Sequence, residues 1–158
     1  MQIHGCAQGA RLQEQHAAGS VVPVPNSGYS QAEDVKNYVL SNYKIDKVYS
    51  SDLKRAFETV KPIAEHLNLP LVKMEAFREI NVGKTFEDVA KEYPNEFGNV
   101  ANRTDSFRYP GGESIGEMKE RFISALDKIA EENENKTVVI GTHGGAVRLL
   151  VSHFEKNE

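Results

Sequence analysis

Two patterns of apolar residues alternate along most of this chain: helical spacing and short continuous runs. Apolar positions three or four residues apart predict helices that begin near Gln31, Leu53, Thr85 and Ser114. Short apolar runs predict strands at 46–50, 71–74 and 136–140. Because strands that alternate with helices are joined by right-handed crossovers, the chain is predicted to fold around a parallel α/β sheet.

Polar residues and prolines indicate where these helices begin and where they are interrupted. The candidate N-caps of the first, second and fourth helices are Ser30, Ser51 or Asp52, and Glu113 or Ser114. Pro62 lies inside the second helical pattern and is expected to kink that helix or to split it in two. The third helix is expected to end at the Tyr-Pro pair 93–94.

The first 30 residues depart from this pattern. The stretch 1–20 is rich in Gln, Ala, Gly and His, and the prolines of 21–26 exclude a regular helix there. We therefore expect an atypical N-terminal segment at 1–30, followed by an α/β domain at 28–158, with a single domain overall.

Length and composition narrow the class of protein. A chain of 158 residues is long enough for one domain with a substantial core. Its net charge of -4 argues against non-specific nucleic-acid binding, which needs a basic face. No apolar run approaches the ~20 residues of a membrane span, and the N-terminus lacks a secretory apolar region. The single cysteine fits a reducing compartment, so we expect a cytoplasmic protein without nucleic-acid or membrane partners.

The motif Thr-His-Gly-Gly at 142–145 directly follows the last predicted strand. A side chain at the carboxyl end of a parallel strand faces the crevice where α/β proteins bind ligands. The glycines let the next helix begin close by, with its first N–H groups facing an anion. His143 and Gly144 are therefore candidates for a phosphate site. The alternative is that His143 is a hydrogen-bonded structural residue.

Two further charged residues follow predicted strands. Arg55 lies one turn into the second helix, where its guanidinium can reach back and hold a phosphate with two hydrogen bonds. The alternative is a surface pair with Glu58 or Asp52. Glu79 stands close to apolar neighbours, and partial burial would suit its carboxyl group to proton donation. Its alternative is a simple ion pair with Arg78.

Other patterns carry less chemistry. The stretch from Cys6 to Arg11 resembles a cysteine-phosphatase loop, but it has four intervening residues where that loop needs five. His16, His66 and His153 have no partner at metal-ligand spacing, so we expect no metal site. The glycine pair 111–112 is too small for a nucleotide-binding loop and is expected only to shape a turn.

Four motifs in this order resemble the histidine phosphatase superfamily, the phosphoglycerate-mutase-like proteins. They are the run 49–59, the Arg-Glu-Ile step 78–80, the Pro-Gly-Gly-Glu-Ser turn 110–114, and 142–145. The resemblance covers roughly residues 28–152. It implies an α/β three-layer sandwich with a mainly parallel sheet. It also implies catalysis without a metal or cofactor, in which a histidine attacks phosphorus and a carboxyl group protonates the leaving oxygen.

The resemblance also implies roles for individual residues. Arg55 is similar to the family's second phosphate-binding arginine, Glu79 to its proton donor, and His143 to its second histidine. His4 stands where the family has its nucleophile, although Ile3 replaces the adjoining arginine. Only three residues precede His4, fewer than the ~5–6 of an average strand, so the first strand is expected to be short or missing.

We therefore expect a phosphomonoester hydrolase that acts on a small phosphorylated metabolite through a phosphohistidine intermediate. A phosphatase is preferred to a mutase because the span between Glu79 and Gly111 is short, whereas the mutases resembled carry longer insertions there. The alternatives are a catalytically impaired relative that binds phosphorylated ligands without turnover, and a phosphoglycerate-mutase-type phosphotransferase. The sequence gives no prediction for the oligomeric state.

Overall fold

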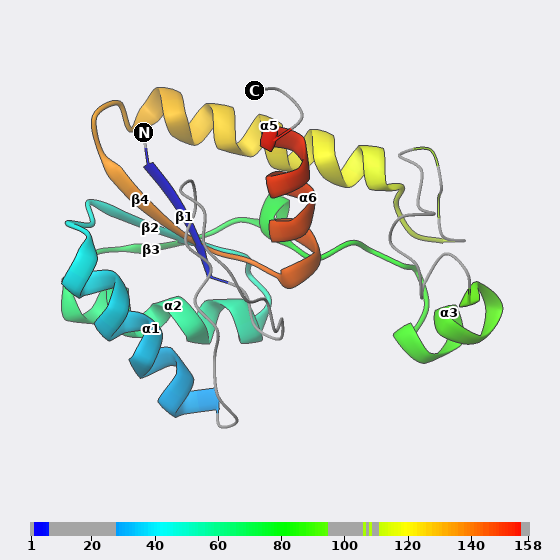
Figure 1. The fold of residues 1–158 in the computed structure, drawn as a ribbon, viewed down its shortest axis with the longest axis horizontal. Coiled ribbons are helices and arrows are strands. Elements are labelled where there is room, and N and C mark those ends of the chain that lie inside the picture. The colour runs from blue at the N-terminus through cyan, green and yellow to red at the C-terminus, as the bar shows by residue number, and fades with distance from the viewer. Residues whose placement is uncertain (1, 7–27, 95–105, 107, 109–110, 156–158) are drawn as a thin grey trace.

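Four parallel strands form one sheet in the part of the chain that the structure, a computed structural model, describes: residues 2–6, 28–94, 106, 108 and 111–155. The strands are β1 (Gln2–Cys6), β2 (Lys47–Ser50), β3 (Leu71–Lys73) and β4 (Thr137–Gly141). Their order across the sheet is β1-β4-β2-β3 (Figure 1). Each pair of neighbouring strands is parallel, which confirms the prediction from the alternation of strands and helices.

The described helices lie between and after these strands. They are α1 (Gly28–Asn42), α2 (Lys54–His66), α3 (Phe86–Glu92), α5 (Ile115–Glu132) and α6 (Gly144–Glu155), with a short 3-10 helix η1 (Glu75–Phe77). Ser114 is the N-cap of α5, since its Oγ accepts the Glu117 N–H at 3.1 Å and Glu117 accepts the Ser114 N–H at 2.8 Å. No helix in these ranges combines the length and the apolar character needed to cross a membrane.

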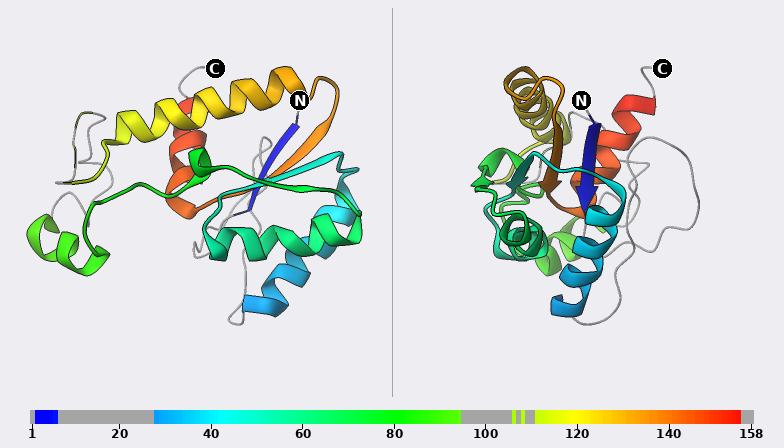
Figure 2. Two further views of the ribbon diagram at one scale, coloured as in Figure 1. Left: turned by 180° about the vertical axis from the view of Figure 1, so that it is seen from behind. Right: turned by 90° about the vertical axis from the view of Figure 1, so that its left-hand side faces the viewer.

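The sheet is covered by helices on both faces. Successive side chains of a strand point to opposite faces, so Val139 of β4 packs with the core of α1 and α2, whereas Val138 and Ile140 pack with α5 and α6. Figure 2 shows α5 on the opposite side of the sheet from α1 and α2. Each fully buried aliphatic side chain stabilises this arrangement by about 1.5–3 kcal/mol. The predicted three-layer α/β sandwich is confirmed.

The first strand is present, so the prediction that it is short or missing is wrong in its second part. The backbone of β1 pairs with β4 from Gln2 opposite Thr137 to Cys6 opposite Gly141. The sequence count stopped at His4, but the strand continues past it for two residues. Five residues pair with β4, which is the one described neighbour of β1.

The predicted ends of two helices need correction. Helix α1 begins at Gly28, so Ser30 lies in its first turn and is not its N-cap. The N-cap residue of α2 is Leu53, whose side chain makes no capping hydrogen bond. Neither predicted cap is therefore the N-cap: Ser51 Oγ accepts the Leu53 N–H at 3.3 Å, and Asp52 pairs with Arg78. Pro62 lies inside α2 without splitting it, since the buried face of the helix offsets the single missing N–H bond.

Candidate active site

The carboxyl ends of three neighbouring strands lie level at one edge of the sheet. Cys6, Ser50 and Gly141 are paired in register at the ends of β1, β2 and β4. The alignment continues for one more residue, because the Ser51 N–H donates to the Gly141 carbonyl at 2.7 Å. Ligands of open α/β sheets bind beyond this edge, so the residues that follow β2 and β4 are well placed for a site.

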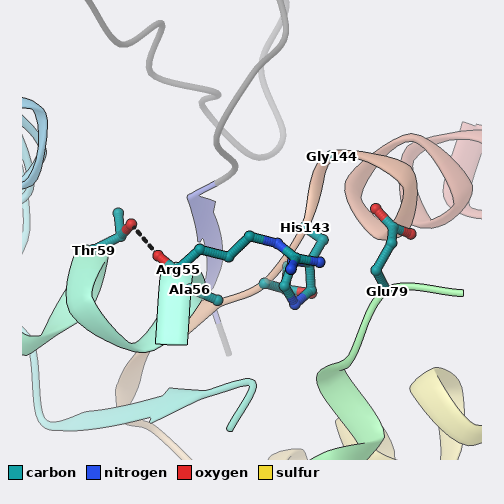
Figure 3. Close-up of a pocket in the computed structure, with 7 residues that line it drawn as sticks. Arg55, Ala56, Thr59, Glu79, His143 and Gly144 are labelled. Atoms are coloured by element: carbon teal, nitrogen blue, oxygen red, sulfur yellow. Dashed lines mark hydrogen bonds between the residues drawn. The ribbon is translucent and has the colours of Figure 1, made fainter. Parts of the chain in front are cut away.

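A cavity of about 190 Å³ lies at this edge (Figure 3). Its walls come from α2, from the segment after η1 and from the junction of β4 with α6. The lining residues are Arg55, Ala56, Thr59, Glu79, Thr142, His143 and Gly144. The structure thus brings together Arg55, Glu79, His143 and Gly144, four of the five site residues that the sequence suggested.

Arg55 and His143 contact each other directly. The Arg55 Nε–H donates to His143 Nδ1 at 3.0 Å, and His143 Nε2 lies 3.0 Å from Ser51 Oγ. A guanidinium is only a donor, so Nδ1 must accept, and the proton of a neutral imidazole is therefore on Nε2. Asp52 pairs with Arg78, so the alternative of a surface pair between Arg55 and Asp52 is wrong.

The imidazole of His143 is kept neutral by its surroundings. Burial lowers its pKa from 6.5 to about 4, with the charge of Arg55 as the second cause, although the Glu79 carboxylate acts in the opposite direction. Its exposed fraction is 5%. The alternative interpretation of His143 as a hydrogen-bonded buried residue therefore describes part of its environment. The same residue also lines the cavity.

Glu79 reaches the cavity from the side opposite α2 (Figure 3). One carboxylate oxygen accepts the Gly145 N–H at 3.0 Å, at the N-terminus of α6, and the other accepts the Ile80 N–H at 3.0 Å. A Cβ at Gly145 would lie 2.4 Å from a Glu79 oxygen, so this close approach requires glycine. The alternative of a simple ion pair between Glu79 and Arg78 is wrong, because Arg78 pairs with Asp52 and Glu75.

Arg78 instead connects the two sides of the cavity. Its Nε–H donates to Asp52 Oδ1 at 2.7 Å, and its second amino group contacts the other Asp52 oxygen and Glu75. This hydrogen-bonded pair lowers the pKa of Asp52 below its usual value. Asp52 precedes the helix that carries Arg55, so the pair ties that region to the segment of Glu79.

The fifth suggested residue, His4, is described only by its backbone. The register places the His4 backbone opposite Val139, two residues before the carboxyl end of β1. Its side chain lies outside what the structure describes, as do Arg11 and His16. Its role as nucleophile therefore stays a prediction. Among the described residues, no cluster of three or more His, Cys, Asp or Glu could hold a metal ion.

Sequence reasoning did not assign Ser51 or Thr59 to the site. Ser51 Oγ contacts His143, and Thr59 Oγ1 donates to the Arg55 carbonyl at 2.8 Å one turn further along α2. Thr59 shares the face of α2 that carries Arg55, which is a signal that the i, i+4 spacing contains. Ser51 could be found only with the knowledge that β2 and β4 are neighbours.

The arrangement combines groups that suit a phosphate ester. A guanidinium and a neutral imidazole line one side, and on the other a carboxylate lies against the N-terminus of a 12-residue helix. The first set can hold the oxygens of an anion through hydrogen bonds. The carboxylate can exchange a proton with a leaving group that enters the same cavity.

Known proteins are similar to this chain in sequence and in fold. The chain is 34% identical over 135 residues to phosphoglycerate mutase-like protein 4 of Arabidopsis thaliana, covering 82% of this chain and 59% of that protein. It is 30% identical over 147 residues to the uncharacterized phosphatase PhoE of Bacillus subtilis, covering 90% of this chain and 70% of that protein. The solved structure of Bacillus stearothermophilus YhfR matches with a TM-score of 0.68 and 25% identity, over 79% of this chain and 63% of that one.

A mycobacterial glucosyl-3-phosphoglycerate phosphatase has the same fold, with a TM-score of 0.67 at 22% identity, over 81% of this chain and 67% of that one. The chain spans 59% and 70% of the lengths of the two curated relatives. The family model for the histidine phosphatase superfamily (branch 1) matches residues 4–158. Sequence and fold agree, and the chain belongs to branch 1 of the histidine phosphatase superfamily.

Proposed function

We propose that this protein is a phosphomonoester hydrolase that acts on a small phosphorylated metabolite through a phosphohistidine. The observation that carries the proposal is the convergence of Arg55, Glu79 and His143 on one cavity at the carboxyl edge of the sheet. Relatives named as phosphatases support it, among them PhoE and a phosphoserine phosphatase of Hydrogenobacter thermophilus, which is 31% identical over 115 residues.

Substrate binding uses the cationic side of the cavity. The Nε–H of Arg55 donates to His143. Among the residues that the structure describes, the two terminal amino groups of the guanidinium are then available for phosphate oxygens. A phosphate dianion beside His143 favours the protonated imidazole, because opposite charges stabilise each other in a buried site. His143 then changes from a neutral acceptor into a cationic donor, so its hydrogen bond from the Arg55 Nε–H opens, and it stabilises charge on the transferring phosphoryl group.

The reaction proceeds in two steps. A ring nitrogen of His4 attacks phosphorus, the bond from phosphorus to the ester oxygen breaks, and protonated Glu79 gives its proton to that oxygen. Water then attacks the phosphohistidine, the phosphorus–nitrogen bond breaks, and the Glu79 carboxylate accepts a proton from the water. Phosphate and an alcohol leave, and both His4 and Glu79 return to their starting forms.

A second candidate function is binding of phosphorylated ligands without turnover. Ile3 in place of the family's arginine favours it, because one positive charge that matches the transition state is lost next to His4. In both functions we place the protein in the cytoplasm, a proposal supported by its single cysteine.

Release of phosphate from p-nitrophenyl phosphate tests the proposal. We expect turnover that EDTA does not reduce, and that Arg55→Ala weakens by about 30-fold, as loss of a charged hydrogen-bond donor to the phosphate does. Phosphate binding without any release, measured by calorimetry on the same preparation, would favour the non-catalytic function. Loss of activity with EDTA would contradict the metal-independent mechanism.

A further inference from the structure

Arg121 of α5 is directed at the backbone that carries Glu79. Its guanidinium donates to the carbonyls of Ala76 at 2.6 Å, Arg78 at 2.9 Å and Glu79 at 3.3 Å. The side chain is three-quarters buried, with 25% of its area exposed. Three backbone acceptors for one guanidinium fix the path of a segment that has no regular secondary structure after η1.

Glu113 binds both Arg121 and the backbone that follows Glu79 in the chain. Both of its carboxylate oxygens accept from Arg121, at 2.9 and 2.6 Å, and one of them also accepts the Asn81 N–H at 2.9 Å. The Glu113 N–H donates back to the Asn81 carbonyl at 2.7 Å. The pair of Arg121 and Glu113 therefore holds the chain both before and after Glu79.

The glycine before Glu113 makes this close approach possible. A Cβ at Gly112 would lie 2.1 Å from the Asn81 carbonyl oxygen and 2.8 Å from the Val82 carbonyl carbon, which are backbone atoms that cannot move aside. The sequence predicts only that the glycine pair 111–112 shapes a turn. In the structure it is also the surface against which residues 81–82 lie.

We propose that the pair of Arg121 and Glu113 is a positioning device for the Glu79 carboxylate in proton transfer. The proposal rests on the proposed function of Glu79 as proton donor. Arg121 does not line the cavity, so it acts through the backbone and not on the substrate. A displacement of about 1 Å in a catalytic group can reduce the rate about 100-fold, so a segment without regular structure needs such support.

The variants that test it are Arg121→Gln, which keeps a polar side chain, and Arg121→Lys, which keeps the charge but not the fork. Lys128→Gln is the matched control, because Lys128 lies on the same helix, is 69% exposed and pairs only loosely with Glu132 at 3.9 Å. Turnover is compared on two esters, p-nitrophenyl phosphate and glycerol 2-phosphate. The first has a leaving group that needs little protonation, and the second has an alkoxide that needs a proton.

We expect Arg121→Gln to reduce kcat/KM, which reports phosphoryl transfer to His4 and not the later hydrolysis of the phosphohistidine, by about 10- to 100-fold on glycerol 2-phosphate and by less than about threefold on p-nitrophenyl phosphate. Inhibition by inorganic phosphate changes by less than about threefold, because Arg55 and His143 are intact and the charge of Arg121 acts on His143 less than burial, Arg55 and Glu79 do. Arg121→Lys falls between the wild type and Arg121→Gln, and Lys128→Gln equals the wild type. Equal losses on both esters, or no loss, would overturn the proposal.

Amide hydrogen exchange gives a readout that does not depend on activity. The N–H groups of Ile80 and Gly145 both donate to Glu79, so Arg121→Gln should reduce their protection while the amides of β4 keep theirs. Unchanged protection of both amides overturns the positioning role even if the enzyme is active. Inactivity of the wild type on both esters overturns the proposed function and leaves the exchange result to decide the positioning.

Discussion

The two regions that meet at the carboxyl edge of the sheet differ in how they are held. Strands β2 and β4 each have strand neighbours on both sides, and the residues that follow them are joined through Ser51, His143 and Arg55. Strand β1 has β4 as its one described neighbour, and its His4 lies level with Val139. The proposed phosphate-holding side is thus built on the centre of the described sheet, whereas the proposed nucleophile belongs to a strand at its edge.

The difference shows which part of the site the core supports. Val138 and Val139 of β4 are fully buried on opposite faces, so any movement of this strand disturbs both helical layers. Residues placed by such a strand keep their geometry before a ligand arrives. We therefore expect binding of phosphate to depend on residues 50–60 and 141–145, and turnover to depend additionally on how β1 presents His4.

Replacing the proposed nucleophile, His4, should give the largest loss of turnover among these variants. If His4 forms the phosphohistidine, His4→Ala reduces turnover by about 10³-fold or more and abolishes an acid-labile phosphoenzyme trapped by rapid quench. Phosphate affinity remains, since Arg55 and His143 are unchanged. His66→Ala is the control, a histidine at the exposed end of α2. Wild-type turnover in His4→Ala would show that His4 is not the nucleophile.

Removal of the guanidinium tests the region built on β2. We expect Arg55→Ala to weaken vanadate or phosphate binding by about 2–4 kcal/mol, measured by titration calorimetry. Arg55→Lys should rescue binding poorly, because a point charge cannot replace the fork. The neighbouring exposed Lys54 supplies the control Lys54→Ala. Unchanged affinity in Arg55→Ala would remove this residue from the phosphate site.

The buried imidazole gives stability a dependence on pH. Burial lowers the pKa of His143 from 6.5 to about 4, so between these values the unfolded state binds the proton and the folded state does not. The contribution of the neutral His143 imidazole to the free energy of unfolding is complete above pH 6.5 and is lost as the pH falls towards 4. At about 1.4 kcal/mol per pKa unit, the loss reaches about 3 kcal/mol.

Urea unfolding of the wild type and His143→Gln at several pH values between 7 and 4 measures this loss. The wild type should lose more stability than His143→Gln as the pH falls, because glutamine does not titrate. The exposed His66 provides His66→Gln, which should behave as the wild type does. Parallel pH profiles for the wild type and His143→Gln would show that the folded protein does not exclude the proton.

A methyl group at the start of α6 should have the smallest effect. In Gly145→Ala the new Cβ meets the Glu79 carboxylate at 2.4 Å, and the carboxylate has to move because it is the free end of its side chain. We expect turnover to fall about tenfold while the free energy of unfolding changes by about 1 kcal/mol. Calorimetry should find phosphate affinity retained, and an unchanged kcat would contradict this placement of Glu79.

Local patterns were sufficient for most elements of the fold. Helical spacing and the N-cap candidate Ser114 located α5, and the apolar runs located β2 and β4, because these signals lie within a few residues of the chain. Strand β1 was harder to predict, since five residues without a flanking helical pattern gain their structure from pairing with β4. The start of α2 was also hard to predict, because Ser51 Oγ accepts the Leu53 N–H before the helix begins instead of capping the helix.

The sequence by itself determined the parallel α/β class, and its motifs named Arg55, Glu79, His143 and Gly144, four residues that the structure brings into one cavity. Only the tertiary structure decided the contacts among them, the tautomer of His143 and the approach of Glu79 to Gly145. It also decided that Arg121 supports the Glu79 segment from more than 40 positions away. Hydrogen bonds between distant residues depend on strand order and helix packing, and neither leaves a periodic trace in the chain.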